Sequence, residues 1–121
     1  NLPPAVIVRT LPNHASKKSR NWSNSNPAYF EASAASWLAE KGVDHWLIDL
    51  PSVDRESDGG VLAAHHAYWN YPDNPRRDST ITEFVYAPDT LEDGRHLLNL
   101  QTAAVDLDAT PSRPIIIPCS Q

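Results

Sequence analysis

The sequence predicts an α/β domain in which a mixed sheet of about five strands packs with two helices. Five short segments are rich in β-branched or apolar residues, as strands are: residues 5–10, 43–50, 79–87, 97–105 and 113–119. Two intervening segments, 27–41 and 61–69, place apolar side chains at helical spacing. The strand–helix–strand order of the first fifty residues is typical of a βαβ unit, so we expect its two strands to be parallel neighbours.

The first strand, residues 5–10, is apolar almost throughout, which suits a strand buried on both faces. Residues 11–26 are polar and contain Pro12, so they predict a long loop. The run Lys17-Lys18-Ser19-Arg20-Asn21-Trp22 in this loop has two interpretations. It could be a basic-aromatic patch for phosphate or single-stranded nucleic acid, or a solvated loop whose tryptophan packs back on the domain. The acidic composition of the chain favours the second interpretation.

The first helix is predicted to begin at Pro27 or at Glu31 and to end at Lys41. Asn26 followed by Pro27 is typical of a helix start, and Gly42 is typical of a left-handed helix end. The apolar stripe consists of Phe30, Ala34, Trp37 and Leu38. We therefore expect Trp37 to lie in the core.

The remaining elements follow from the same patterns. Residues 43–50 predict a second strand, 51–60 a loop, and 61–69 a short helix that carries two adjacent histidines. Residues 71–78 contain two prolines and predict a loop before the strand 79–87. The last strand, 113–119, carries prolines that are tolerated at strand starts and edges.

Composition narrows the class of protein. A chain of 121 residues predicts one domain, residues 1–121. The formal net charge of −5 argues against a general nucleic-acid binder. No apolar run approaches the length of a membrane span, so we expect no membrane partner. Cys119 is the single cysteine, which favours a reducing, cytoplasmic compartment.

His65 and Glu83 are the first candidates for chemistry. Imidazole and carboxylate together are normal ligands of zinc or manganese. The two residues are too far apart in sequence for a local chelate, so they would meet only if the helix and the strand lie side by side. The alternative is a histidine on a helix surface and a glutamate on a strand face. His66 is the weaker candidate, because adjacent helical side chains point about 100° apart.

Three further polar residues follow the second strand. Asp49, at the strand end, could orient a ligand histidine or a turn amide, and the Ser52 hydroxyl could cap the turn. Ser52, His65 and Asp54 could also be drawn as a nucleophilic triad, although the sequence around Ser52 does not resemble a nucleophile elbow. Roles in shaping the loop are favoured for Asp49, Ser52 and Asp54.

Taken together, three segments resemble the cyclase family of metal-dependent hydrolases, which includes the bacterial-type kynurenine formamidases. They are Asp49-Leu50-Pro51-Ser52-Val53-Asp54, Leu62-Ala63-Ala64-His65 and Thr80-Ile81-Thr82-Glu83. The resemblance implies part of the swivelling β/β/α fold of that family. It also implies zinc or manganese ligation by His65 and Glu83. Asp49, Ser52, Asp54 and His66 are the candidates for supporting residues around that pair.

One part of the family pattern has no counterpart in this sequence. The family's His-x-Gly-Thr-His-x-Asp segment lies in its N-terminal half and supplies most metal ligands and the general base, but none of the five histidines has that setting. We therefore expect the C-terminal portion of a hydrolase that cleaves amide, lactam or ester bonds with metal-activated water. Alone it would be inactive and could bind no metal; its partner would be the missing N-terminal half or further copies of itself, and its small-molecule substrate is not named by the sequence. The alternative is a non-catalytic, oligomeric binding or structural domain derived from that fold.

Overall fold

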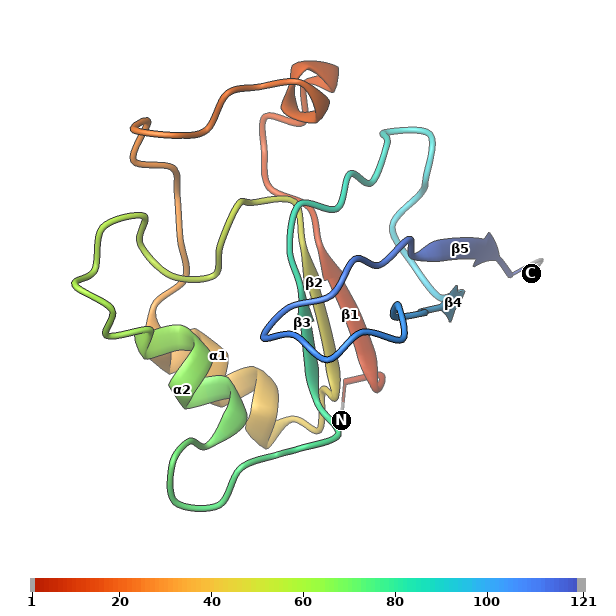
Figure 1. The fold of residues 1–121 in the computed structure, drawn as a ribbon. Helices are drawn as coiled ribbons and strands as arrows, with labels where there is room; N and C mark the ends of the chain where they lie inside the picture. The colour runs from red at the N-terminus through yellow and green to blue at the C-terminus, as the bar shows by residue number, and fades with distance from the viewer. Residues whose placement is uncertain (1, 120–121) are drawn as a thin grey trace. The chain divides into compact units, whose positions relative to one another are not determined.

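The computed structural model describes residues 2–119, which fall into two compact units that meet at Ala87 and Pro88. The first unit contains β1 (Ala5–Val8), η1 (Ala15–Lys18), α1 (Ala32–Glu40), β2 (His45–Ile48), α2 (Ala63–Trp69) and β3 (Thr80–Thr82) (Figure 1). The second contains β4 (His96–Asn99) and β5 (Ile115–Pro118), an antiparallel ribbon. The α/β class, the five strands and the two α-helices are confirmed. The strands are divided between two sheets, because β4 and β5 pair only with each other.

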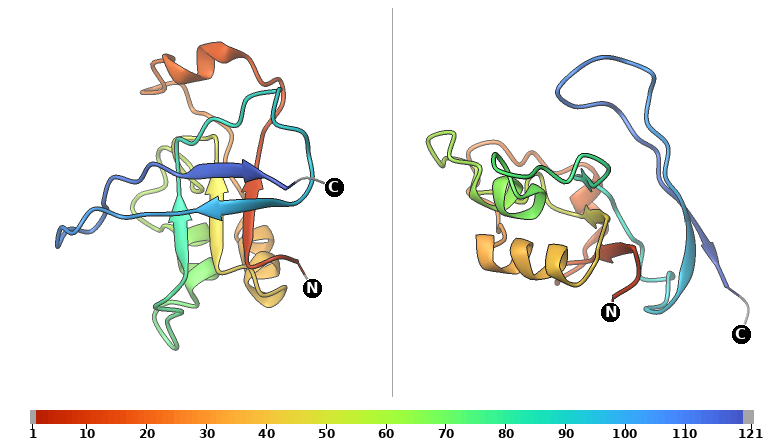
Figure 2. Two further views of the ribbon diagram at one scale, coloured as in Figure 1. Left: turned by 90° about the vertical axis from the view of Figure 1, so that its right-hand side faces the viewer. Right: turned by 90° about the horizontal axis from the view of Figure 1, so that it is seen from below.

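The first unit is built on a parallel sheet with the strand order β1-β2-β3. The pairing of β1 with β2 runs from Ala5 opposite His45 to Val8 opposite Ile48, so the predicted parallel neighbours are confirmed. Both α-helices lie on one face of this sheet and pack on each other (Figure 2). All three strands therefore end at the same edge, where the loops that follow them meet.

The core of this unit is centred on Trp46, which is fully buried. The ring of Phe30 meets it edge-on at 4.9 Å, and the ring of Tyr68 lies 5.4 Å away. The Tyr68 hydroxyl donates a hydrogen bond of 3.0 Å to the carbonyl of Val43, which satisfies its polar end inside the core. Truncating a buried aromatic residue of this kind to alanine typically costs about 3–5 kcal/mol.

Helix α1 begins at Ala32 with Glu31 as its N-cap, so the alternative start at Pro27 is wrong. Asn26 has a φ of 45°, a left-handed conformation, whereas an N-cap residue needs an extended one. The segment before the helix is instead tied to the loop after β2, because the Phe30 amide donates to the Val53 carbonyl at 2.8 Å.

Trp37 is half exposed, and its predicted place in the core is wrong. The buried residues of α1 are Ala35 and Leu38, and the Trp37 ring lies 5.9 Å from the Lys41 ammonium instead. The end of the helix is as predicted: Gly42 has a φ of 81°, and Val43 donates back to the carbonyl of Leu38. This bond and the one from the Gly42 amide to the Ala39 carbonyl form a Schellman cap.

All five strands are shorter than the segments predicted for them, and β3 and β4 differ most. β3 ends at Thr82 because Phe84, two residues later, has a left-handed φ of 59°. β4 spans His96–Asn99 and does not reach Val105. Trp22, from the basic loop, is partly buried against the core, as the packing interpretation of that loop predicts. Within residues 2–119, no helix is long and apolar enough to cross a membrane.

Burial of Tyr68 makes the stability of the fold depend on pH in the alkaline range. Loss of hydration raises the pKa of Tyr68 to about 12 from its usual 10, although the nearby Arg76 partly opposes the shift. Because the pKa is higher in the folded state, this contribution to stability is complete below pH 10 and is lost as the pH rises through about 12. We expect the free energy of unfolding to fall over this pH window, and we expect Tyr68→Phe to remove the part of the fall that Tyr68 causes. Urea unfolding at a series of alkaline pH values measures this free energy. Tyr71→Phe, at an exposed tyrosine, is the control, and an equal alkaline loss in both variants contradicts the assignment.

Candidate functional site

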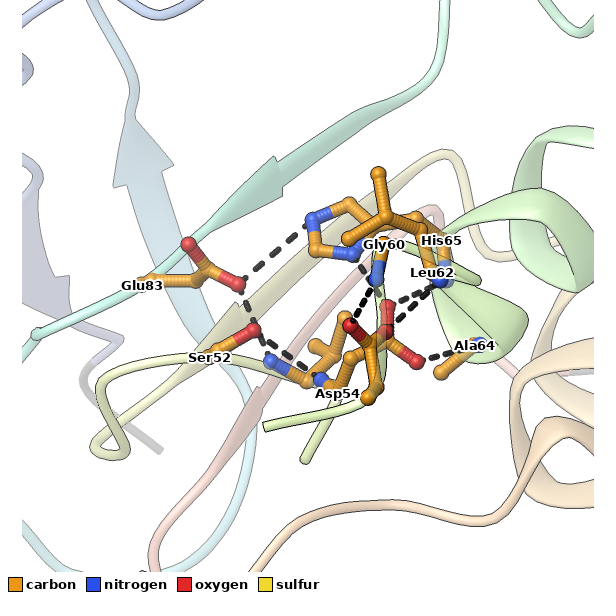
Figure 3. Close-up of polar contacts among 9 residues, drawn as sticks. Ser52, Asp54, Gly60, Leu62, Ala64, His65 and Glu83 are labelled. Atoms are coloured by element: carbon orange, nitrogen blue, oxygen red, sulfur yellow. Dashed lines mark hydrogen bonds and ion pairs between the residues drawn. The ribbon is translucent and has the colours of Figure 1, made fainter. Parts of the chain in front are cut away.

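The candidate site lies at the edge where the parallel strands of the first unit end. Residues 49–54 follow β2, Glu83 follows β3, and His65 lies in the first turn of α2. Such an edge is where open α/β sheets place their ligands. Figure 3 shows that Ser52, Asp54, His65 and Glu83 converge there from three separate segments.

Asp54 joins the loop after β2 to helix α2. Its Oδ1 accepts a 2.6 Å hydrogen bond from the Ala64 amide, and its Oδ2 accepts a 3.3 Å bond from the His65 amide (Figure 3). Leu62, the residue at the N-cap position, makes no side-chain capping bond, so Asp54 caps the helix from a distance. The carboxylate is buried, and its two capping bonds fix where α2 begins relative to β2.

Asp54 also sets the orientation of the His65 ring. Its Oδ2 lies 2.6 Å from Nδ1 of His65. A carboxylate can only accept, so Nδ1 carries the proton of this hydrogen bond. Nε2 is thereby turned toward Glu83, whose Oε1 lies 3.6 Å away, beyond hydrogen-bonding distance (Figure 3). The helix and the strand thus bring His65 and Glu83 together, as a shared role requires.

Glu83 is held in place by the backbone around it. Its Oε1 accepts a 2.9 Å hydrogen bond from the Val53 amide, in the same loop as Asp54. The next residue, Phe84, is left-handed, a conformation that costs a bulky residue about 1–3 kcal/mol. The Phe84 amide still donates to the Leu50 carbonyl, so the chain stays bound to the end of β2 after regular pairing stops.

Ser52 supports this loop, as the sequence predicts. Its hydroxyl oxygen accepts a 3.0 Å hydrogen bond from the Asp54 amide, two residues on, which is the geometry of a serine turn. The bond stabilises the turn that carries Asp54 toward α2. The hydroxyl therefore shapes the loop that orients His65.

Asp49 has a different set of partners. Its side chain is 1% exposed and accepts hydrogen bonds from the Thr10 amide and hydroxyl, both at 2.9 Å, and from Nζ of Lys17 at 2.8 Å. Asp49 therefore ties the end of β1 and η1 to the end of β2. Removing one partner of a buried ion pair typically costs about 3–5 kcal/mol. Neither Thr10 nor Lys17 was predicted for this site, since only the tertiary fold brings them to Asp49.

His66 lies within α2, and Asp58 lies in the loop before this helix. The His66 ring contacts Tyr71 at 5.0 Å and so points away from the pair formed by His65 and Glu83.

Asp58 accepts hydrogen bonds from the amides of Leu62 and Gly60, at 2.7 and 2.8 Å, and these bonds lower the pKa of Asp58. Its support of the loop is therefore present above the usual carboxyl pKa and is lost in acid.

The donor set fits half of a metal site. His65 offers a ring nitrogen and Glu83 a carboxylate oxygen on the same side, and the other His65 nitrogen is bound by a carboxylate, as in metal-ligating histidines. Catalytic zinc sites usually have three protein ligands. Among residues 2–119, no group of three or more His, Cys, Asp or Glu side chains could hold a metal ion.

Comparison with known proteins places this geometry in context. Residues 2–55 match the protein-family model described as "Putative cyclase". The chain is 32% identical over 115 residues to the kynurenine formamidase of Bordetella petrii and 33% identical to that of Bordetella pertussis; each match covers 95% of this chain and 50% of the relative. The kynurenine formamidase of Bacillus cereus is 33% identical over 90 residues, which are 74% of this chain and 40% of the relative. The chain thus spans about half the length of the curated relatives it matches. The resemblance seen in the sequence is confirmed.

The two functions of Asp54 can be separated by substitution. Asp54→Ala removes the cap of α2 and the partner of His65, so we expect a loss of about 2 kcal/mol in the free energy of unfolding. Asp54→Asn keeps an oxygen for the Ala64 amide but can turn its amide toward Nδ1, which moves the His65 proton to Nε2. Urea unfolding and long-range ¹H–¹⁵N spectra of the imidazole measure the two effects. Asp58→Asn, which caps the same loop without bonding the ring, is the control. An unchanged His65 tautomer in Asp54→Asn would count against this geometry.

Proposed function

We propose, from the similarity of this chain to the cyclase family model and to kynurenine formamidases, that it forms part of a hydrolase that cleaves amide, lactam or ester bonds. The supporting observation is the line of contacts from Asp54 through His65 to Glu83, with 2.6 Å between Asp54 and Nδ1 and 3.6 Å between Nε2 and Glu83. In this line a carboxylate fixes the ring so that Nε2 lies beside Glu83 Oε1, an oxygen that accepts one hydrogen bond from the Val53 amide. The arrangement suits zinc or manganese, which supply Lewis-acid polarisation of a carbonyl and activation of water.

Each residue would have a separate task. His65 Nε2 and Glu83 Oε1 would hold the ion. Asp54 would keep His65 in the tautomer that leaves Nε2 free, and Ser52 would keep the Asp54 turn in shape. Losing such an orienting partner typically lowers metal affinity or activity about 10–100-fold.

The proposal requires a partner. Two donors hold a metal poorly, and the chain spans about half of its curated relatives. We propose that the remaining ligands and the general base come from a polypeptide equivalent to the other half of those relatives, or from another copy of this chain. The relatives are named kynurenine formamidases, so an aryl formamide is the first substrate to test.

Metal content and activity test this proposal together. The chain is stripped, loaded with zinc or manganese, and assayed alone and with the unmatched half of the Bordetella petrii relative. We expect the chain alone to retain little metal and to hydrolyse no formamide. The associated pair should retain about one ion and should hydrolyse the formamide. His65→Ala and Glu83→Gln should lower metal retention and activity at least about a hundredfold, whereas His66→Ala, which faces Tyr71, should not. Elemental analysis and product formation give the readouts. Association of the halves without metal or activity would falsify the proposal.

A second candidate is a non-catalytic, oligomeric domain, and the second unit favours it. Leu97, Ile115 and Ile117 of the β4–β5 ribbon are 61%, 47% and 50% exposed. An isolated two-stranded ribbon is marginally stable in water, so an apolar surface of this kind suits contact with another copy. We expect light scattering to show an oligomer that Leu97→Lys or Ile117→Lys dissociates, with Leu107→Lys, at another exposed apolar residue of this unit, as the control. A monomeric mass for the unsubstituted chain contradicts this candidate.

A further inference from the structure

A hollow of about 260 Å³ lies beside the site, within the first unit. It is lined by Trp22, Ser23, Pro27, Pro51, Ser52, Asp54, Glu56 and Phe84. Ser52 and Asp54 belong to the contacts that orient His65, so the hollow is continuous with the site. Its volume is just below the range of drug-sized ligand pockets, which suits a small group such as one substituted ring.

Four of the eight lining residues are aromatic residues or prolines, whose side chains offer flat apolar surface. Trp22 and Pro27 come from the loop before α1, Pro51 from the loop after β2, and Phe84 from the segment after β3. Phe84 is 63% exposed in a left-handed conformation, so its ring is available for contact. Trp22 is partly buried against the core, and the guanidinium of Arg20 lies 4.4 Å from its ring centre. Aromatic and proline walls of this kind favour a neutral, planar, apolar ligand group.

Glu56 holds the loop that carries Trp22. Its Oε1 accepts a 2.5 Å hydrogen bond from the Asn24 amide, and its Oε2 accepts a 2.7 Å bond from the Asn26 amide. Asn24 and Asn26 both have a left-handed backbone conformation, with φ of 59° and 45°. The amides of these two residues therefore both face the Glu56 carboxylate. Next to Glu56, the Arg55 guanidinium donates a hydrogen bond to the Tyr29 hydroxyl. This contact joins the same two loops at a residue farther along the chain from Trp22.

We propose that Glu56 is a positioning residue of this site: its carboxylate fixes the Trp22 loop as one wall of the hollow, which receives the apolar, planar part of the substrate. The inference rests on the proposed function, since it assigns the hollow to that substrate. Glu56 is exposed, so its hydrogen bonds compete with water and add little to global stability. Its effect should therefore be seen in ligand affinity and not in the unfolding midpoint.

Binding of formanilide, a small aryl formamide, to the full chain tests the proposal. The chain has four tryptophans, whose indole N–H signals can be followed by ¹H–¹⁵N spectroscopy, with Trp22→Phe identifying the Trp22 signal. We expect the Trp22 signal to shift saturably with formanilide and the signal of Trp37, on α1, to stay in place. Glu56→Ala should weaken binding about tenfold, the equivalent of one charge-assisted hydrogen bond. Glu56→Gln, which keeps one acceptor oxygen, should be intermediate.

Glu40→Ala, at an exposed glutamate that does not line the hollow, is the matched control and should bind like the unsubstituted chain. Urea unfolding of Glu56→Ala and Glu56→Gln checks that the folded state is retained. The proposal is overturned if formanilide leaves the Trp22 signal unmoved, if Glu56→Ala binds as tightly as the unsubstituted chain, or if Glu40→Ala weakens binding equally. His65→Ala separates this inference from the proposed hydrolysis, because it should lower metal retention and activity of the associated pair while the Trp22 signal of the chain still shifts with formanilide.

Discussion

The hydrogen bonds of Asp54 are the constraint on which the rest of the site depends. A single buried carboxylate caps α2 through two backbone amides and orients the His65 ring through Nδ1. The position of the helix and the direction of Nε2 are therefore set by the same group. Because Asp54 lies in the loop after β2, the most buried strand of the sheet, His65 is fixed relative to the core. A shift of the helix would carry the ring away from Glu83.

Asp54 is one of three carboxylates in the segment 49–56 that each bind a different part of the chain. Asp49 binds the end of β1 and η1, Asp54 binds α2, and Glu56 binds the Trp22 loop. In each case a carboxylate accepts from backbone amides that have no partner in regular structure. At the buried Asp49 and Asp54, leaving such groups unsatisfied would be costly. The end of β2 therefore organises the whole edge of the sheet. The ion pair of Asp49 with Lys17 also explains how one lysine of a basic loop becomes part of the structure.

Local sequence patterns predicted the elements but not their limits or long-range partners. The strand and helix periods identified both α-helices and all five strands, and Gly42 marked the end of α1. The start of α1 was open because Asn26 and Pro27 carry the chemistry of a cap, whereas the structure binds the Asn26 amide to Glu56. Trp37 satisfied the apolar spacing, yet the packing of α1 selects the neighbouring Leu38.

In the candidate site, too, the sequence indicates residue types but not the long-range contacts between them. His65 and Glu83 could be selected by chemical type and by resemblance, but their proximity depends on α2 lying beside β3, a tertiary fact. The partners Thr10, Lys17 and Glu56 carry no local signal, because each is joined to its partner across a long stretch of sequence. Such pairs become visible only when the parallel strands place their loops at one edge.

The way in which the two proposed ligands are held bears on how a complementing chain would act. Asp54 and the Val53 amide fix His65 and Glu83 with contacts made within the first unit alone. Their side chains therefore need no ordering by a partner, and the conformational entropy of that ordering would not be lost on assembly. A second polypeptide would have to bring its own donors and a covering surface, but it would meet a pair of ligands already in place. The conformational cost of completing the site would therefore fall on the incoming partner, whose donors are the ones still to be arranged.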